Sequence, residues 1–240
     1  MNVQNSLNTD LGFSLNAMLP KIPGLDLESL LKFTIEPNDT QAILDVQKTM
    51  LLAPQRSRMI TWTQDAVEKS ENFMKLFNER YIPELPTNLE LIDCPEFSLG
   101  RAIGKHLISN NIQLDFSGFD LSMFYLKDMN ILTYLAIRGI RTHDIVHSAL
   151  GLGVTPIDEY AVASFTLAQF RSPYHMVLVS SGYIHTAFYQ PEEIPNFLNT
   201  IHKFYNLGLN SEFILGYRFE DNLDKPLSEV RKELGLPLDL

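Results

Sequence analysis

Cysteine is almost absent from this sequence. Cys94 is the single cysteine among 240 residues. An intrachain disulfide and any metal site built from several cysteines are therefore excluded. We predict that Cys94 is a small, buried, apolar side chain.

Long apolar runs and basic clusters are lacking as well. No stretch approaches the roughly 18 consecutive apolar residues of a membrane span, so we expect a soluble chain that can still lie against a membrane. The first 25 residues contain no arginine and resemble neither a signal nor a transit peptide, so we expect a cytoplasmic location. The formal net charge is −10, which argues against a broad basic surface for nucleic acid.

The composition is that of a folded chain with one core. Hydrophobic residues make up 45% of the sequence and charged residues 20%, which is ample for a single core at this length. Residues 1–37 carry few charges and three prolines, so we expect a loosely ordered N-terminal segment. Residues 38–240 show mostly helical apolar spacing. They predict an all-α single domain, a bundle of about eight helices.

The expected helices follow from apolar spacing, caps and stop signals. Trp62 is predicted to be a core aromatic, and residues 83–95 are predicted to be a loop. Gly139 is predicted to close a helix, and 174–189 is ambiguous between a strand and the helix that we favour. The helical segments are 38–52, 57–81, 97–111, 126–139, 174–189, 191–208 and 226–235.

Two histidines stand close together in the stretch HDIVHSALGLGVTPIDE, which begins at residue 143. In a helix, His143 and His147 lie one turn apart on one face, and Asp144 borders that face. The sequence GLG at 151–153 then breaks the helix. Thr155 can cap the next helix, and Glu159 falls in its first turn.

A short connection between two helices favours an antiparallel hairpin, so Glu159 can face the two histidines. Two imidazoles and two carboxylates form an N2O2 ligand set. Such a set suits Zn, Mn or Fe(II) better than Mg. The alternative is that these are ordinary polar residues on an exposed helix, with Glu159 serving only as a favourable first-turn acid. The remaining histidines show no ligand spacing and are predicted to be structural: His106, His175, His185 and His202.

The signature HD-x-x-H, eleven residues, then E resembles that of the coenzyme Q (ubiquinone) biosynthesis protein family known as Coq-four. The resemblance covers roughly residues 40–237. It extends to the weaker matches LGRAIGKHLISNN and PLSEVRKELGLPL. The specific part is the signature itself.

The resemblance implies a nearly all-helical fold with a long apolar tunnel that holds a polyprenyl tail. It implies a metal ion, zinc foremost and Mg, Mn or Fe as alternatives, bound by His143, Asp144, His147 and Glu159. The implied activity is C1 decarboxylation of a polyprenylated hydroxybenzoate with hydroxylation at the same carbon, and we expect Glu159 and His147 to be catalytic. Arg138 matches an arginine of the family and is expected to anchor a carboxylate or phosphate head group, unless it is a solvated arginine at a helix end.

The implied partners are a polyprenyl lipid or prenylated quinone precursor, a membrane contacted peripherally, and other quinone-biosynthesis proteins. A homodimer is expected because twofold dimers are the commonest oligomers. Ile145 and Val146 depart from the aromatic residues usual in the family, which fits a bacterial homologue with a different prenylated substrate.

Two further function classes stay open at this point. One is a prenyl-lipid-binding scaffold that presents substrate to partner enzymes, with a metal that is structural or grips a head group. The other is a metal-dependent phosphohydrolase, because contiguous His-Asp also marks that superfamily. The phosphohydrolase hypothesis is weakened because the sequence has no clearly placed additional His and Asp ligands.

Overall fold

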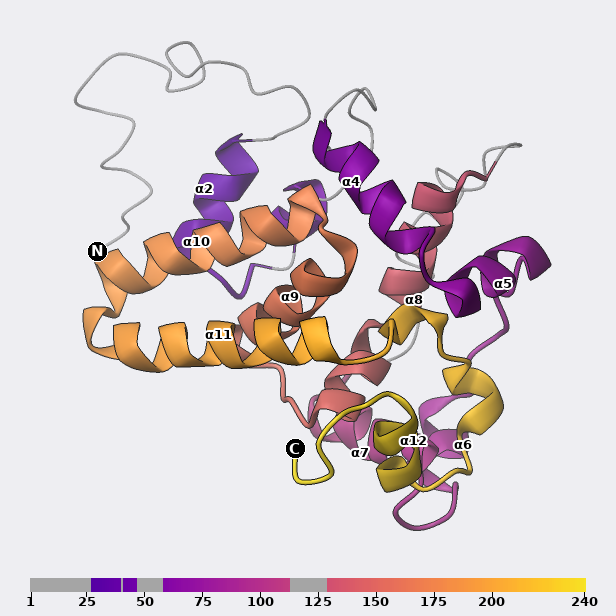
Figure 1. Ribbon diagram of the computed structural model, residues 1–240. Coiled ribbons are helices and arrows are strands. Elements are labelled where there is room, and N and C mark those ends of the chain that lie inside the picture. The colour runs from indigo at the N-terminus through magenta and orange to yellow at the C-terminus, as the bar shows by residue number, and fades with distance from the viewer. Residues whose placement is uncertain (1–26, 40, 47–57, 113–128) are drawn as a thin grey trace.

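The computed structural model describes residues 27–39, 41–46, 58–112 and 129–240. These residues form helices, and no strand occurs among them; a single bridge pairs Ser98 with Pro226. The all-α prediction is confirmed (Figure 1). The helices are α2 (Leu27–Ile35), α4 (Arg58–Val67), α5 (Glu71–Glu79), α6 (Asn88–Ile92), α7 (Leu99–Ser109), α8 (Ile131–Leu150), α9 (Pro156–Phe170), α10 (Pro173–Tyr189), α11 (Ile194–Asn210) and α12 (Leu227–Glu233), with short 3₁₀ turns η4 (Pro191–Glu193), η5 (Ile214–Gly216) and η6 (Phe219–Asn222).

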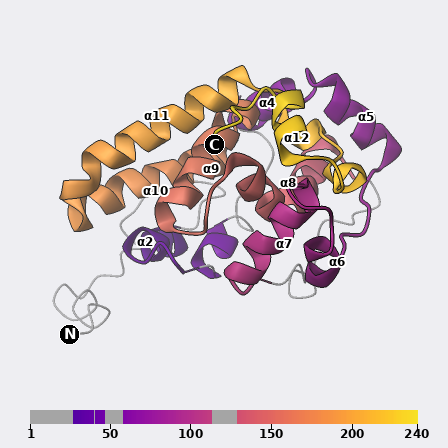
Figure 2. The same ribbon diagram turned by 90° about the horizontal axis from the view of Figure 1, so that it is seen from below.

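Two apolar clusters hold these helices together. The larger core joins α5, α6, α7, α8 and α12, and the smaller core joins α2, α10 and α11. Helix α9 supplies side chains to both, with Phe165 in the larger core and Tyr160 in the smaller one. Figures 1 and 2 both place α9 between the α10–α11 side and the α7–α8 side. The burial of its two faces explains why α9 carries almost no polar stripe.

The helix predicted over 57–81 is in fact two helices. Helix α4 ends at Val67, and α5 begins at Glu71. Ser70 separates them, because its Oγ accepts a hydrogen bond from the backbone N–H of Phe73 at 3.3 Å. A serine cap of this kind competes with continuation of a helix and starts a new one.

The loop predicted over 83–95 contains the short helix α6. Thr87 and Glu90 form a capping box at its start. The Thr87 N–H donates to Glu90 Oε2 at 2.8 Å, and the Glu90 N–H donates to Thr87 Oγ1 at 3.3 Å. The signal for this helix was present in the sequence, since threonine followed three residues later by glutamate is a helix start.

The prediction that Gly139 closes a helix is wrong, because α8 continues to Leu150. Ile137 and Ile145, on either side of the glycine, are both buried. A glycine inside a helix costs only about 1 kcal/mol relative to alanine, so this packing outweighs it. The continuity of α8 carries the histidines on the same rigid element as Arg138.

Within the predicted N-terminal segment, the described residues include a helix. Residues 27–35 form α2, whose Phe33 ring meets the Tyr160 ring edge to face at 6.4 Å. The helix expected over 38–52 is present at 41–46, while residues 47–52 lie outside the described residues. Packing on α9 and α10 therefore orders a stretch that has little intrinsic pattern.

The segment 174–189 is helical as predicted, within α10. The prediction for Trp62 is wrong, because this residue is 46% exposed. The buried side of α4 is formed by Thr63 and Val67, and Thr63 Oγ1 donates to the Arg171 carbonyl at 3.1 Å. Cys94 is only partly buried, with its Sγ 3.6 Å from the Glu90 carbonyl.

Within the described ranges, no helix combines the length and apolarity that crossing a bilayer requires. The apolar tunnel stays a prediction.

Candidate metal centre

The last turn of α8 is held in a defined position. Gly151 ends the helix with a positive φ of 67°, and the Leu152 N–H donates to the His147 carbonyl at 2.9 Å. A Cβ added at Gly151 would lie 2.8 Å from the backbone of Leu240, so glycine is required by space as well as by φ. Arg231 Nε donates to the carbonyl of Ala149 at 2.9 Å. These contacts fix the turn that carries His147.

The start of α9 follows the predicted capping pattern. Asp158 Oδ2 accepts hydrogen bonds from the backbone N–H of Thr155 at 3.1 Å and from its hydroxyl at 2.5 Å. Pro156 occupies the first turn, where its missing N–H costs nothing. Glu159 therefore begins an ordered helix directly across the hairpin from α8.

Three ligand atoms converge at this hairpin. His143 Nε2 lies 3.1 Å from His147 Nε2, and Glu159 oxygens lie 3.4 Å and 3.5 Å from these two nitrogens. One ligand atom from each of the three residues can be chosen so that all lie within 4.8 Å of one another. Tetrahedral coordination with bonds of about 2.1 Å separates neighbouring ligand atoms by about 3.4 Å. The predicted convergence of His143, His147 and Glu159 is confirmed.

Hydrogen bonding fixes the tautomer of His147. Its Nδ1 lies 2.6 Å from the carbonyl of Gly153, which can only accept, so Nδ1 carries the proton. In the neutral ring, the lone pair is then on Nε2, which faces His143 and Glu159. A backbone carbonyl on the second nitrogen is the usual outer support of a metal-binding histidine. The His147 side chain is fully buried, whereas 45% of the His143 side chain is exposed.

The charges of the site suit cation binding. Burial raises the pKa of Glu159, but the adjacent imidazoles of His143 and His147 outweigh it and hold the pKa well below its ordinary value. Burial lowers the pKa of His143, but the Glu159 carboxylate outweighs this and raises it. The site thus keeps a carboxylate ionised and favours positive charge at His143, and a divalent ion would supply that charge.

The residues present therefore fit a divalent metal ion. Two imidazole nitrogens and a carboxylate oxygen match the His2Glu ligand type of catalytic zinc, which leaves further positions open. The partial exposure of His143 and Glu159 leaves access from one side of the site. Such an arrangement can bind an anionic group of a substrate next to the ion.

Asp144 does not join the three converging residues. Its Oδ1 lies 3.9 Å from Nε2 of His106, a residue of α7. The role of Asp144 as a metal ligand stays a prediction. His106 itself, predicted to be structural, is packed against the centre: its ring stacks on that of His147 with centroids 5.7 Å apart.

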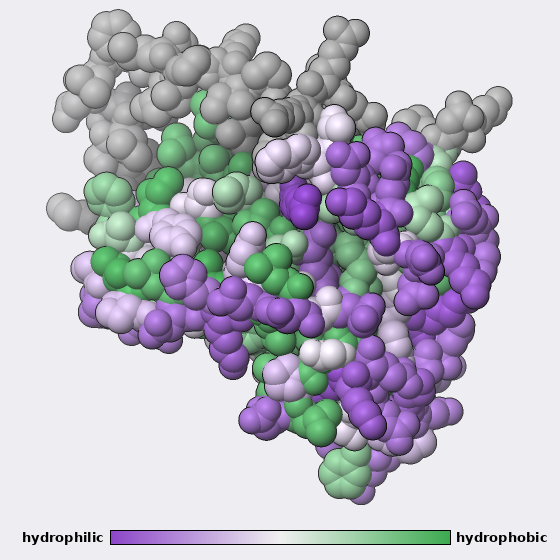
Figure 3. All heavy atoms as spheres, viewed as in Figure 1, coloured by the Kyte–Doolittle hydropathy of each residue, from purple (hydrophilic) through white to green (hydrophobic). Residues whose placement is uncertain are grey.

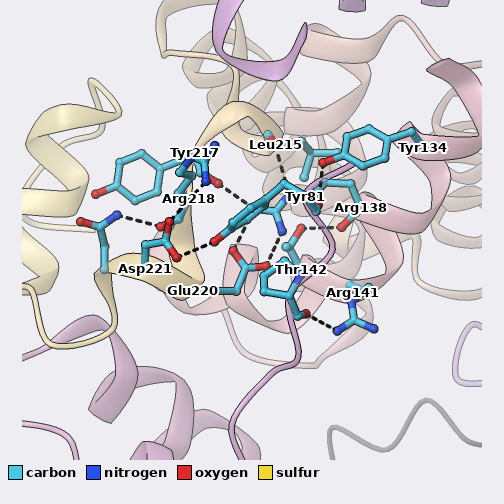
Figure 4. Close-up of polar contacts among 12 residues, drawn as sticks. Tyr81, Tyr134, Arg138, Arg141, Thr142, Leu215, Tyr217, Arg218, Glu220 and Asp221 are labelled. Atoms are coloured by element: carbon cyan, nitrogen blue, oxygen red, sulfur yellow. Dashed lines mark hydrogen bonds and ion pairs between the residues drawn. The ribbon is translucent and has the colours of Figure 1, made fainter. Parts of the chain in front are cut away.

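Arg138 is neither solvated nor at a helix end. The residue is 2% exposed and pairs with Glu220, as Figure 4 shows. Its guanidinium also donates to the carbonyls of Tyr217 at 2.7 Å and Leu215 at 3.4 Å. These bonds tie α8 to the segment of η5 and η6. They explain Arg138 structurally, and a head-group role for it stays a prediction that this geometry does not support.

The sequence did not predict that two further histidines, His106 and His175, lie near the metal centre. His106 lies on α7 and His175 lies in the first turn of α10, so neither shares a helix with the signature. Burial, and then the nearby His143, lower the pKa of His175 to about 3. Only the packing of separate helices brings these imidazoles together, and no spacing rule along one helix reports it.

Comparisons with known proteins show the family to which this chain belongs. The family model of the coenzyme Q (ubiquinone) biosynthesis protein Coq4 matches residues 40–238. The ubiquinone biosynthesis protein COQ4 homolog 2, mitochondrial, from Paramecium tetraurelia is 26% identical over 147 residues, covering 61% of this chain and 67% of that protein. A crystal structure from Nostoc punctiforme PCC 73102, described as that of a candidate ubiquinone biosynthesis protein, shares the fold. It has a TM-score of 0.71 at 23% identity and covers 87% of this chain and 95% of that chain. The chain belongs to the Coq4 family of coenzyme Q (ubiquinone) biosynthesis proteins.

Proposed function

We propose that this protein acts in ubiquinone-type biosynthesis as a metal-dependent enzyme. The proposed reaction replaces the C1 carboxyl group of a polyprenylated hydroxybenzoate by hydroxyl. The carboxyl group leaves as CO₂, water supplies the new hydroxyl, and O₂ is the two-electron oxidant and leaves as hydrogen peroxide. The observation that carries the proposal is the set of ligand atoms from His143, His147 and Glu159, which lie within 4.8 Å of one another. Membership of the Coq4 family supports the pathway.

His143, His147 and Glu159 would hold the ion, zinc by their donor types, with Asp144 as the proposed fourth ligand. A bound divalent ion would supply Lewis acidity that stabilises negative charge on the substrate. His147 presents a rigid, correctly protonated imidazole, because Gly153 holds its Nδ1–H. Glu159 stays ionised beside the two imidazoles. We assign the catalytic roles to these two residues.

A non-catalytic scaffold that binds prenyl lipid is the second candidate, and one surface favours it. Helix α10 contains no Asp, Glu, Lys or Arg. Figure 3 shows hydrophobic residues gathered on this side of the molecule. The exposed large apolar residues of α10 are Met176, Tyr183, Ile184, Phe188 and Tyr189. This surface suits peripheral contact with a membrane or with another quinone-biosynthesis protein, and homodimerisation remains part of the same proposal.

Metal binding is tested by elemental analysis of purified protein. We expect about one divalent ion per chain, lost in His147→Ala. His202→Ala is the matched control, because His202 is exposed on α11, outside the ligand set. Wild-type protein that takes up no Zn²⁺, Mn²⁺ or Fe²⁺ overturns the metal-dependent function.

Turnover separates the enzyme from the scaffold. The metal-loaded protein is incubated in air with a polyprenylated hydroxybenzoate, and the product is followed by mass spectrometry. We expect replacement of the carboxyl group by hydroxyl with the wild type and none with Glu159→Gln. Retention of unaltered prenylated substrate by both proteins would select the scaffold instead.

A further inference from the structure

His106 contributes a buried polar atom that the fold leaves without a partner. It lies on α7 between Ile103 and Leu107, both fully buried in the larger core. The His106 side chain is 8% exposed. Its Nε2 is buried and finds no hydrogen-bond partner in the part of the chain that the structure describes. Buried polar atoms normally have a hydrogen-bond partner, so we expect this nitrogen to have one in the functional protein.

The surroundings of His106 point to the metal centre. Its ring stacks on His147 with planes 29° apart and centroids 5.7 Å apart. Its Nε2 lies 3.9 Å from Oδ1 of Asp144, which is too long for a hydrogen bond. An approach of about 1 Å would give a charge-assisted hydrogen bond. His106 thus touches one ligand and faces a carboxylate that directly follows another.

Direct ligation by His106 is disfavoured by the same geometry. Among the described residues, the group whose ligand atoms converge contains His143, His147 and Glu159 but not His106. Asp144 is also outside that group, although it lies next to His143 on the same helix. One of its carboxylate oxygens faces His106, and a carboxylate has a second oxygen to offer.

We propose that His106 is a positioning residue of the metal centre: its Nε2–H holds Oδ1 of Asp144 and so orients this carboxylate toward the ion. The inference rests on the proposed metal-dependent function and deepens it. Outer-shell partners of this kind fix the orientation of ligands, and their loss typically weakens metal affinity by about 10–100-fold. His106 also limits the movement of the His147 ring by stacking on it.

The test is Co²⁺ titration followed by the visible absorption of the bound ion, which reports its coordination. We expect His106→Phe to bind one Co²⁺ about 10–100-fold more weakly than the wild type, with an altered spectrum. His106→Gln keeps an N–H donor and is expected to stay close to the wild type. His202→Phe, at an exposed position, serves as the control for replacing a histidine by phenylalanine.

A double-mutant cycle separates positioning from a general effect on the fold. If His106 acts through Asp144, adding His106→Phe to Asp144→Ala weakens Co²⁺ binding no further. An equal weakening in both backgrounds overturns the inference, as does a His106→Phe variant that binds Co²⁺ like the wild type. Failure of the wild type to bind Co²⁺, Zn²⁺, Mn²⁺ or Fe²⁺ overturns the proposed metal function and this inference with it.

A second measurement does not depend on the folding of His106→Phe. In protein labelled with ¹⁵N-histidine, Zn²⁺ is expected to bring out a protected Nε2–H signal from His106. We expect Asp144→Ala, which removes the acceptor oxygen, to lose this signal, whereas its persistence in that variant contradicts the proposed contact.

Discussion

Helix α8 carries two polar clusters that differ in what they lack. Around Arg138, donors meet acceptors: the guanidinium pairs with Glu220 and with two backbone carbonyls, and both side chains are almost fully buried. Around His143, two imidazole nitrogens and a carboxylate face one another with few protons to share. The first cluster is complete within the chain, whereas the second has the ligand set that a cation would fit. The family resemblance implies roles for both Arg138 and the two histidines, but only the second cluster brings together the ligand atoms of a cation site.

The largest expected effect on stability comes from removing Arg138 from its buried ion pair with Glu220. Arg138→Met leaves Glu220 buried without its partner, so we expect a loss of about 3–5 kcal/mol in the free energy of unfolding. Urea denaturation measures it. Arg138→Met/Glu220→Met removes both charges and should recover much of the loss. If the single variant is as stable as the wild type, Arg138 is not the structural residue described above.

Added metal should change stability only through the cluster around His143. Zn²⁺ at 100 times its dissociation constant should stabilise the wild type by about 3 kcal/mol, because the ion binds the folded state. His143→Ala should lose this gain while changing metal-free stability little, since much of the side chain is exposed. Thermal unfolding with and without Zn²⁺ measures it. An equal gain in His143→Ala would place the ion elsewhere, and His202→Ala should behave as the wild type.

Acid should destabilise the metal-free protein through His175. This imidazole is held neutral in the folded state, where its pKa is about 3, against an ordinary value of about 6.5. Below pH 6.5 the unfolded chain binds more protons than the folded one, so stability falls as the pH drops toward 3.

Between pH 7.5 and 5.0 this single group accounts for about 2 kcal/mol. Urea denaturation in EDTA at both values should show a correspondingly smaller loss in His175→Phe than in the wild type or His202→Phe. The same acid loss in all three proteins would show that His175 is not held neutral.

The smallest effect concerns the two capping boxes. Thr155→Ala and Thr87→Ala each remove a threonine hydroxyl from a helix start, and each should cost about 1 kcal/mol in stability. Only Thr155 begins the helix of a proposed metal ligand, Glu159, so only Thr155→Ala should also weaken Zn²⁺ binding. Isothermal titration calorimetry of both variants makes the comparison, and equal Zn²⁺ affinities would show that this cap does not position Glu159.

Local rules were enough to predict the helical class and the hairpin of the metal centre. The spacing of His143 and His147 and the cap at Thr155 act within a few residues, so they can be read along the chain. The burial of Arg138 and the exposure of Trp62 depend on segments far away in sequence. The same holds for the place of His106, which is set by how α7 packs on α8. Periodicity reports faces of a helix, but not which neighbour covers each face.

The position of α9 between two apolar clusters bears on how the molecule comes apart. Loosening the α10–α11 side would expose Tyr160, and loosening the α7–α8 side would expose Phe165, so neither side can open without uncovering part of the same helix. Amide protons in the middle of α9 should therefore exchange only through global unfolding. Cooperativity of this kind keeps Glu159, at the beginning of α9, in position beside α8 until the protein unfolds globally.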